Sequence, residues 1–112
     1  MDMHDARPVI VIFAHHTTQA HWAEVLFGME EEGIPWEWVA CDSENLVDNA
    51  WQAACQSPLL VGIGCDDETL LVHYRNLPVD GPLFRLPRHD RDADARRTGN
   101  NAARLVKGLP FK

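Results

Sequence analysis

Three consecutive glutamates, Glu30, Glu31 and Glu32, end a segment whose apolar residues repeat with helical spacing. The helix dipole disfavours negative charge in the last turn, by about 0.3–1 kcal/mol for each side chain. These carboxylates could form a solvated face. They could instead bind a cation or a basic surface that a partner protein supplies. The residues alone leave both explanations open, and this run is the feature that points to assembly.

Three histidines lie close together in the sequence, and imidazole is the commonest protein ligand of transition metals. They are His15, His16 and His21. No Asp or Cys lies between them at ligand spacing, and nothing in the sequence fixes their geometry. We therefore interpret them as exposed or capping histidines.

Three aspartates occupy the first, third and fifth positions of a calcium-binding loop. They are Asp90, Asp92 and Asp94. Such a loop needs glycine at its sixth position and glutamate at its twelfth, where this chain has Ala95 and Asn101. The segment from residue 89 to residue 97 is therefore predicted to be a solvated, charged loop.

The pair Gly62 and Gly64 follows a predicted strand, as the first glycines of a dinucleotide-binding loop do. Position 67 holds aspartate where that motif needs its third glycine. Close packing of the backbone explains the two glycines better. The chain also has no G-x-S-x-G, H-E-x-x-H or P-loop motif, so hydrolase and NTPase chemistry have no candidate residues.

The 112 residues carry a net charge of −7, and this charge is unevenly distributed. Residues 1–56 hold ten acidic side chains and one basic one, whereas residues 57–112 hold seven and nine. An acidic chain of this kind argues against nucleic-acid binding. The apolar run near the N-terminus is too short for a membrane span or a secretory signal, which predicts a cytoplasmic protein. Three cysteines without close pairs are interpreted as buried thiols.

Strand-like and helix-like periods alternate along the chain, which is typical of an α/β domain. Continuous apolar runs predict buried strands at residues 9–13 and 59–64. Further strands are predicted at residues 36–40, at 70–74 with more exposure, and at 82–86 on a sheet edge.

Helical spacing predicts three helices. The first covers residues 19–32, with Gly33 as its C-cap. The second follows Ser43 as its N-cap and continues toward Pro58. The third begins at Thr98 or Asn100 and ends at Gly108. The sequence therefore predicts a single three-layer domain over residues 1–112, with a mostly parallel sheet flanked by helices and with flexible segments at 1–7 and 88–97.

Four long blocks of this sequence resemble the small subunits of the diol dehydratase and glycerol dehydratase reactivases. In chain order they are EVLFGMEEEGIPW (residues 24–36), AWQAACQSPLLVGIGCD (50–66), VHYRNLP (72–78) and TGNNAARLVKGLPF (98–111). The blocks follow the family's order and spacing and are far more specific than a short motif. The resemblance does not extend to residues 1–8, 15–21 or 87–97.

The resemblance implies a fold similar to that of the dehydratase medium (β) subunit, and a role without catalysis. In this family the small subunit pairs with a large subunit that has an actin-like ATPase domain, as a heterotetramer of two large and two small subunits. ATP or ADP binds to the large subunit, and the small subunit has no cofactor of its own. The complex is chaperone-like: its small subunit swaps places with the medium subunit of an adenosylcobalamin-dependent dehydratase, contacts the dehydratase large subunit and lets inactivated cobalamin leave.

The resemblance also implies a role for the glutamate run. By its position in the motif, Glu31 matches a family glutamate that helps to hold a magnesium ion at the interface with the large subunit. Glu30 and Glu32 would lie beside it in the same partner contact. A hard cation that prefers oxygen ligands would offset the unfavourable charge at the helix end.

Two other functions stay open beside this one. The chain could be the medium structural subunit of the dehydratase itself, which would contact cobalamin. It could also be a free-standing small α/β enzyme, which the missing catalytic motifs disfavour. The four blocks serve diol and glycerol dehydratases alike, so the sequence does not decide the client, and association with a bacterial microcompartment is also left open.

Overall fold

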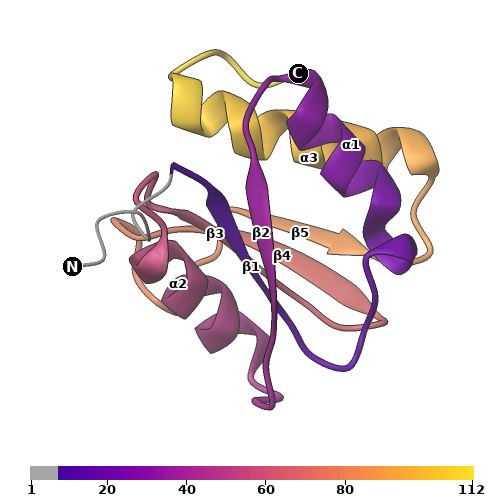
Figure 1. Ribbon diagram of the computed structural model, residues 1–112, viewed down its shortest axis with the longest axis vertical. Helices are drawn as coiled ribbons and strands as arrows, with labels where there is room; N and C mark the ends of the chain where they lie inside the picture. The colour runs from indigo at the N-terminus through magenta and orange to yellow at the C-terminus, as the bar shows by residue number, and fades with distance from the viewer. Residues whose placement is uncertain (1–7) are drawn as a thin grey trace.

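The computed structural model describes residues 8–112 as a five-stranded sheet between two helical layers (Figure 1). The strands are β1 (Ile10–Ala14), β2 (Trp36–Ala40), β3 (Val61–Cys65), β4 (Thr69–Tyr74) and β5 (Phe84–Pro87). The helices are a short 3-10 turn η2 (Ala20–Trp22), α1 (Ala23–Glu31), α2 (Leu46–Gln56) and α3 (Asp92–Lys107). This element order confirms the predicted α/β class. The predicted flexible segment 1–7 lies outside the described residues.

The sheet has the strand order β2-β1-β3-β4-β5 and is mixed. β1 pairs in parallel with β2 and β3, whereas β3 with β4 and β4 with β5 are antiparallel. The prediction of a mostly parallel sheet is therefore wrong. A parallel pair needs a crossover of a dozen or more residues, and the turn between β3 and β4 contains only residues 66–68. Asp66 closes that turn, because its Oδ1 accepts hydrogen bonds from the backbone N–H groups of Glu68 and Thr69.

The predicted exposure of β4 is also wrong, since its four central residues are buried. β4 lies between β3 and β5, with helices on both faces of the sheet, so only its ends reach solvent (Figure 1). The prediction of an edge strand is confirmed for β5, which begins after Pro82 and pairs with β4 alone among the described strands.

α2 covers one face of the sheet, and α1 and α3 cover the other (Figure 1). Side chains alternate along β3, so Val61, Ile63 and Cys65 join the core beneath α1 and α3. Gly62 and Gly64 face α2, where an added Cβ on Gly62 would overlap the backbone of Ala54. This contact confirms that the two glycines serve close packing.

The start of α2 differs from the prediction, whereas the end of α3 agrees with it. Asn45, not Ser43, is the N-cap of α2, because its side chain accepts a hydrogen bond from the N–H of Asp48 at 3.1 Å. Ser43 instead accepts a hydrogen bond from the N–H of Asn45. Gly108 ends α3 with a left-handed φ of 70°, which confirms the predicted stop.

The predicted loop at residues 89–97 is wrong from Asp92 onward, where α3 begins. The flexibility of residues 88–97 stays a prediction. Asp94 pairs with Arg91 and Arg97 at i,i+3 spacing, and acidic side chains in the first turn complement the helix dipole. The fully buried residues of α3 are small or carry amide groups. They are Gly99, Asn100, Asn101, Ala102 and Ala103. The large apolar residues of α3, Leu105 and Val106, lie only in the last turn, so the first turns give no clear apolar signal.

Within residues 8–112, no helix combines the length and the apolar character that crossing a membrane requires. All three cysteines are free thiols. The interpretation as buried thiols holds fully for Cys65, whose thiol pKa is raised by burial, whereas Cys41 and Cys55 are half-buried.

Candidate functional site

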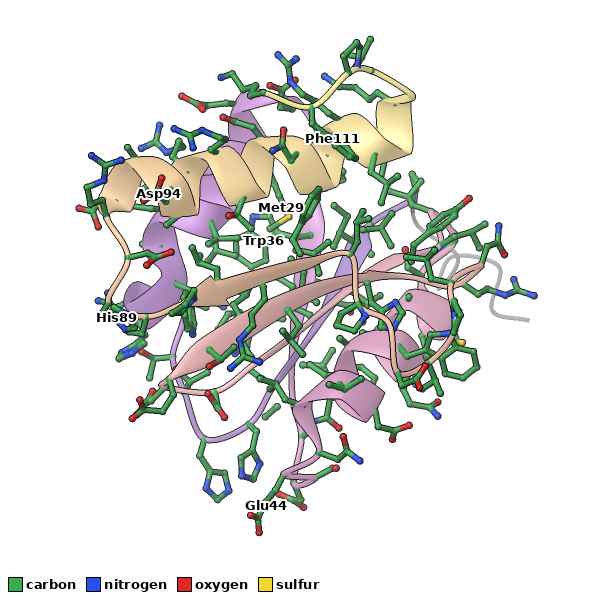
Figure 2. The ribbon with its side chains drawn as sticks, turned by 180° about the vertical axis from the view of Figure 1, so that it is seen from behind. Met29, Trp36, Glu44, His89, Asp94 and Phe111 are labelled. Atoms are coloured by element: carbon green, nitrogen blue, oxygen red, sulfur yellow. The ribbon has the colours of Figure 1, made fainter. Side chains whose placement is uncertain are left out.

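α1 and α3 cross in direct backbone contact, which brings their charged side chains within reach of one another. Gly28 of α1 faces Gly99 of α3, and an added Cβ on either glycine would overlap the backbone of the other helix. Figure 2 shows Met29 beneath this helix pair, toward the sheet, where its side chain is fully buried. The contact places the end of α1, with its three glutamates, against the side of α3.

Glu31 is held by two side chains of α3. Its Oε2 accepts a hydrogen bond from Nη1 of Arg96 at 2.8 Å, and its Oε1 accepts one from Nδ2 of Asn100 at 3.0 Å. The Asn100 hydrogen bond, followed by the Arg96 charge, lowers the pKa of Glu31 below its usual value of 4.5. The Glu31 side chain is 50% exposed, so its carboxylate is accessible from solvent although it is paired.

Glu32 is paired more completely. Its Oε1 lies 2.9 Å from Nζ of Lys107 and its Oε2 lies 3.0 Å from Nε of Arg104. These hydrogen bonds, with that of Lys107 the stronger influence, lower the pKa of Glu32. Lys107 also donates to the backbone carbonyl of Glu32 at 2.8 Å. Only 12% of the Glu32 side chain is exposed, so this residue fastens the end of α1 to α3.

Glu30 accepts a hydrogen bond from Nε1 of Trp36 at 3.1 Å. All three glutamates therefore have partners within this chain. The sequence left open a solvated face or a cation from a partner protein, and the structure shows a further arrangement in which α3 itself supplies the cations. Sequence reasoning missed Arg96 because it placed that residue in a loop.

Arg96 is the central residue of this surface. Besides Glu31 it binds Glu24, whose Oε1 lies 2.8 Å from its Nη2 and accepts a hydrogen bond from its Nε at 3.0 Å. Its guanidinium also lies 5.5 Å from the centre of the Phe27 ring, which is 45% exposed. We refer to Glu24, Phe27, Glu31, Glu32, Arg96, Arg104 and Lys107 together as the α1–α3 rim. Arg96, Arg104 and Lys107 lie on one side of α3 at helical spacing. This spacing could have been recognised in the sequence if the helix had been predicted to begin at Asp92.

The rim meets the requirements of a shared magnesium site only in part. Magnesium prefers oxygen ligands, and each oxygen of the half-exposed Glu31 carboxylate keeps a lone pair beyond its hydrogen bond. Among the described residues, however, no three His, Cys, Asp or Glu side chains lie together as a metal site. This chain can therefore offer one carboxylate to an ion whose other ligands come from elsewhere.

The other polar groups singled out from the sequence do not converge. The rings of His15 and His16 stack with centroids 4.1 Å apart, and Nδ1 of His15 lies 3.3 Å from the carbonyl oxygen of Cys41. His21 lies apart from them against Asp67, with its Nε2 2.9 Å from the backbone carbonyl. Asp92 and Asp94 belong to the first turn of α3, as Figure 2 shows for Asp94.

Comparisons with known proteins agree on one family. The profile of the family described as dehydratase medium subunit matches residues 7–112. A propanediol dehydratase-reactivating factor small subunit of Citrobacter freundii is 55% identical, over 100% of this chain and 97% of that protein. A solved diol dehydratase-reactivating factor complexed with ADP and Mg²⁺ is 53% identical with a TM-score of 0.91, over 94% of this chain and 97% of its own. A glycerol dehydratase reactivase is 32% identical with a TM-score of 0.88, over 94% and 96%.

Proposed function

The chain belongs to the dehydratase medium subunit family, and from its likeness to the reactivating-factor small subunits we propose that it is the non-catalytic small subunit of a dehydratase reactivase. The observation that carries this proposal is 55% identity along the whole chain to a reactivating-factor small subunit. The solved reactivating factor with the same fold supports it, at a TM-score of 0.91. The small subunit acts in the cytoplasm as an accessory protein.

In the proposed assembly, two copies of this chain pair with two copies of a large subunit that carries the ATPase activity. The family contains both dehydratase medium subunits and reactivase small subunits, so the two share a fold. Shared shape lets this chain compete with the medium subunit for one surface of the dehydratase large subunit. The nucleotide bound to the reactivase large subunit shifts that competition, and the opened dehydratase releases its inactivated cobalamin.

The proposed contact with the reactivase large subunit includes Glu30, Glu31 and Glu32, with Glu31 as the ligand of an interface magnesium ion. Glu31 suits this role because it is half exposed, whereas Glu32 is nearly covered and is already bound to two cations. The magnesium would neutralise charge between the two subunits, and the ADP and Mg²⁺ in the solved reactivating factor are compatible with this. Replacing Glu31 with Gln should abolish the magnesium dependence of complex formation, and unchanged affinity would remove this role.

The proposed client is a diol dehydratase rather than a glycerol dehydratase. The chain is 51–55% identical to propanediol and diol relatives, and 30–32% identical to glycerol dehydratase relatives. Both groups of relatives align with nearly the whole chain, so the difference in identity does not come from a shorter alignment. A reactivation assay with each purified dehydratase would show a preference for the diol enzyme.

The test of the main proposal is release of bound cyanocobalamin from diol dehydratase in the presence of ATP. Large subunit with this chain should release the cobalamin, and large subunit alone should not. Equal release by the large subunit alone would contradict the proposal. In the alternative suggested by the family's description, this chain would replace the medium subunit in an active dehydratase, and reconstitution of enzyme activity without the authentic medium subunit would support that alternative.

A further inference from the structure

Arg96 contacts its two carboxylates unequally. It directs two donors at Glu24, from Nε at 3.0 Å and from Nη2 at 2.8 Å, but only Nη1 at Glu31. It also stacks over the exposed ring of Phe27. If the bond to Glu31 breaks, Arg96 still has a carboxylate and an aromatic ring to hold it in place.

Glu31 has a second support that does not depend on Arg96. Asn100 is buried, and its Nδ2 donates both to the carbonyl oxygen of Gly28 at 2.8 Å and to Oε1 of Glu31. Its Oδ1 accepts a hydrogen bond from Nζ of Lys112. Asn100 therefore orients the Glu31 carboxylate from the helix interface, whereas Arg96 binds it from the solvent side, where both side chains are partly exposed.

We propose that Arg96 is an exchangeable internal counter-ion that competes with the interface magnesium for Glu31. This inference rests on the proposed role of Glu31 at the subunit interface. In the free chain Arg96 neutralises Glu31, and on assembly the metal takes its place while Arg96 stays on Glu24 and Phe27. Partly exposed ion pairs are weak, so a divalent cation that gains further ligands from the partner can displace one.

The test measures the magnesium concentration needed for half-maximal complex formation with the reactivase large subunit, by sedimentation velocity. Arg96→Gln removes the competing cation and should lower that concentration about two- to fivefold, as expected for one half-exposed ion pair. Glu24→Gln removes the second carboxylate of Arg96, so Arg96 binds Glu31 more firmly and the required concentration should rise. An unchanged or higher requirement for Arg96→Gln would overturn the inference, because it would mean that Arg96 positions Glu31 for the metal or plays no part.

Arg91→Gln is the matched control, since Arg91 is also a cation, at the start of α3, but pairs with Asp94, outside the α1–α3 rim. It should leave the magnesium requirement unchanged, and a shift as large as that of Arg96→Gln would overturn the inference by showing a general charge effect. Melting curves establish that each variant folds. If Arg96→Gln does not fold, Glu24→Gln is the test: a raised magnesium requirement would support the inference, and an unchanged or lower one would overturn it.

Glu31→Gln separates the two levels of the proposal. If the wild-type complex forms independently of magnesium and Glu31→Gln binds equally well, the proposed interface role fails and the inference falls with it. If Glu31→Gln abolishes magnesium dependence while Arg96→Gln changes nothing, the interface role stands and only the exchange at Arg96 is wrong.

Discussion

On each side of the sheet two elements meet in backbone contact through glycines, but the side chains around the two contacts differ. α2 touches β3 through Gly62 and Gly64, and α1 touches α3 through Gly28 and Gly99. Around α2 the core cluster is small and apolar. Around the α1–α3 contact, in contrast, carboxylates and cations form the half-exposed α1–α3 rim.

This difference indicates which part of the molecule is fixed and which part can exchange partners. A backbone contact through glycine tolerates no added atom, so it determines the fold. Ion pairs at a partly exposed rim can be replaced by equivalent charges from another chain. We therefore assign a structural role to the α2 face, and the proposed contact with the large subunit to the rim.

The largest expected effect is that of Gly62→Ala, because the new methyl group would overlap the backbone of Ala54 in α2. The strand is fixed by neighbours on both sides, so the overlap should reduce the free energy of unfolding by about 3 kcal/mol. Urea denaturation measures this loss. Gly81→Ala is the matched control, since its added Cβ would come no closer than 3.7 Å to the carbonyl oxygen of Pro78 and should change stability by less than about 0.5 kcal/mol. If the two substitutions changed the free energy of unfolding equally, β3 and α2 would not be in backbone contact at Gly62.

A smaller effect is expected from Gly99→Ala, although its Cβ would overlap the carbonyl oxygen of Val25. Replacing a helical glycine by alanine favours the helix by about 1 kcal/mol, which offsets part of the overlap. The net loss should be about 1–2 kcal/mol in the same denaturation experiment. Because α3 must shift away from α1, binding to the large subunit should also weaken. If Gly99→Ala bound the large subunit normally but lost more stability than Gly62→Ala, the α1–α3 contact would be the more structural of the two, against this account.

The acid dependence of stability should come from the rim. The folded-state pKa values of Glu31 and Glu32 lie below the usual 4.5, so their ion pairs stabilise the fold above that pH and lose this contribution as the pH falls through the lowered values. Glu32→Gln should therefore lower stability at neutral pH and reduce the loss seen on acidification. Denaturation at pH 7 and pH 3 measures both. Glu30→Gln is the control, because within residues 8–112 the Glu30 side chain accepts a hydrogen bond from Trp36 alone and pairs with no cation. An identical pH profile for both variants would exclude this explanation.

The sequence predicted most elements because their signals are local. Continuous apolar runs indicate β1 and β3, and the order of strands and helices follows from the alternating periods. The mixed sheet was missed although the short 66–68 connection forbids a parallel crossover, so that error was avoidable. The start of α3 was harder to find, since its buried face is formed by residues such as Gly99 and Asn100, whose types do not mark a core.

Only the acidic residues of the candidate site were predictable from the sequence. Glu30, Glu31 and Glu32 stand out as an unfavourable run at a helix end. The cations that pair with Glu31 and Glu32 lie more than sixty residues further along the chain, and pairing them requires knowledge that α3 crosses α1 at Gly28. Long-range pairs of this kind are determined by packing and not by spacing in the sequence.

Hydrogen–deuterium exchange of this chain, alone and bound to the reactivase large subunit with magnesium, tests the assignment of the two faces most directly. We predict slower exchange on binding at the end of α1 and along α3, in peptides covering residues 24–32 and 96–107. Peptides from α2 should exchange at the same rate in both states. Protection of α2 with unchanged exchange at the rim would contradict the account.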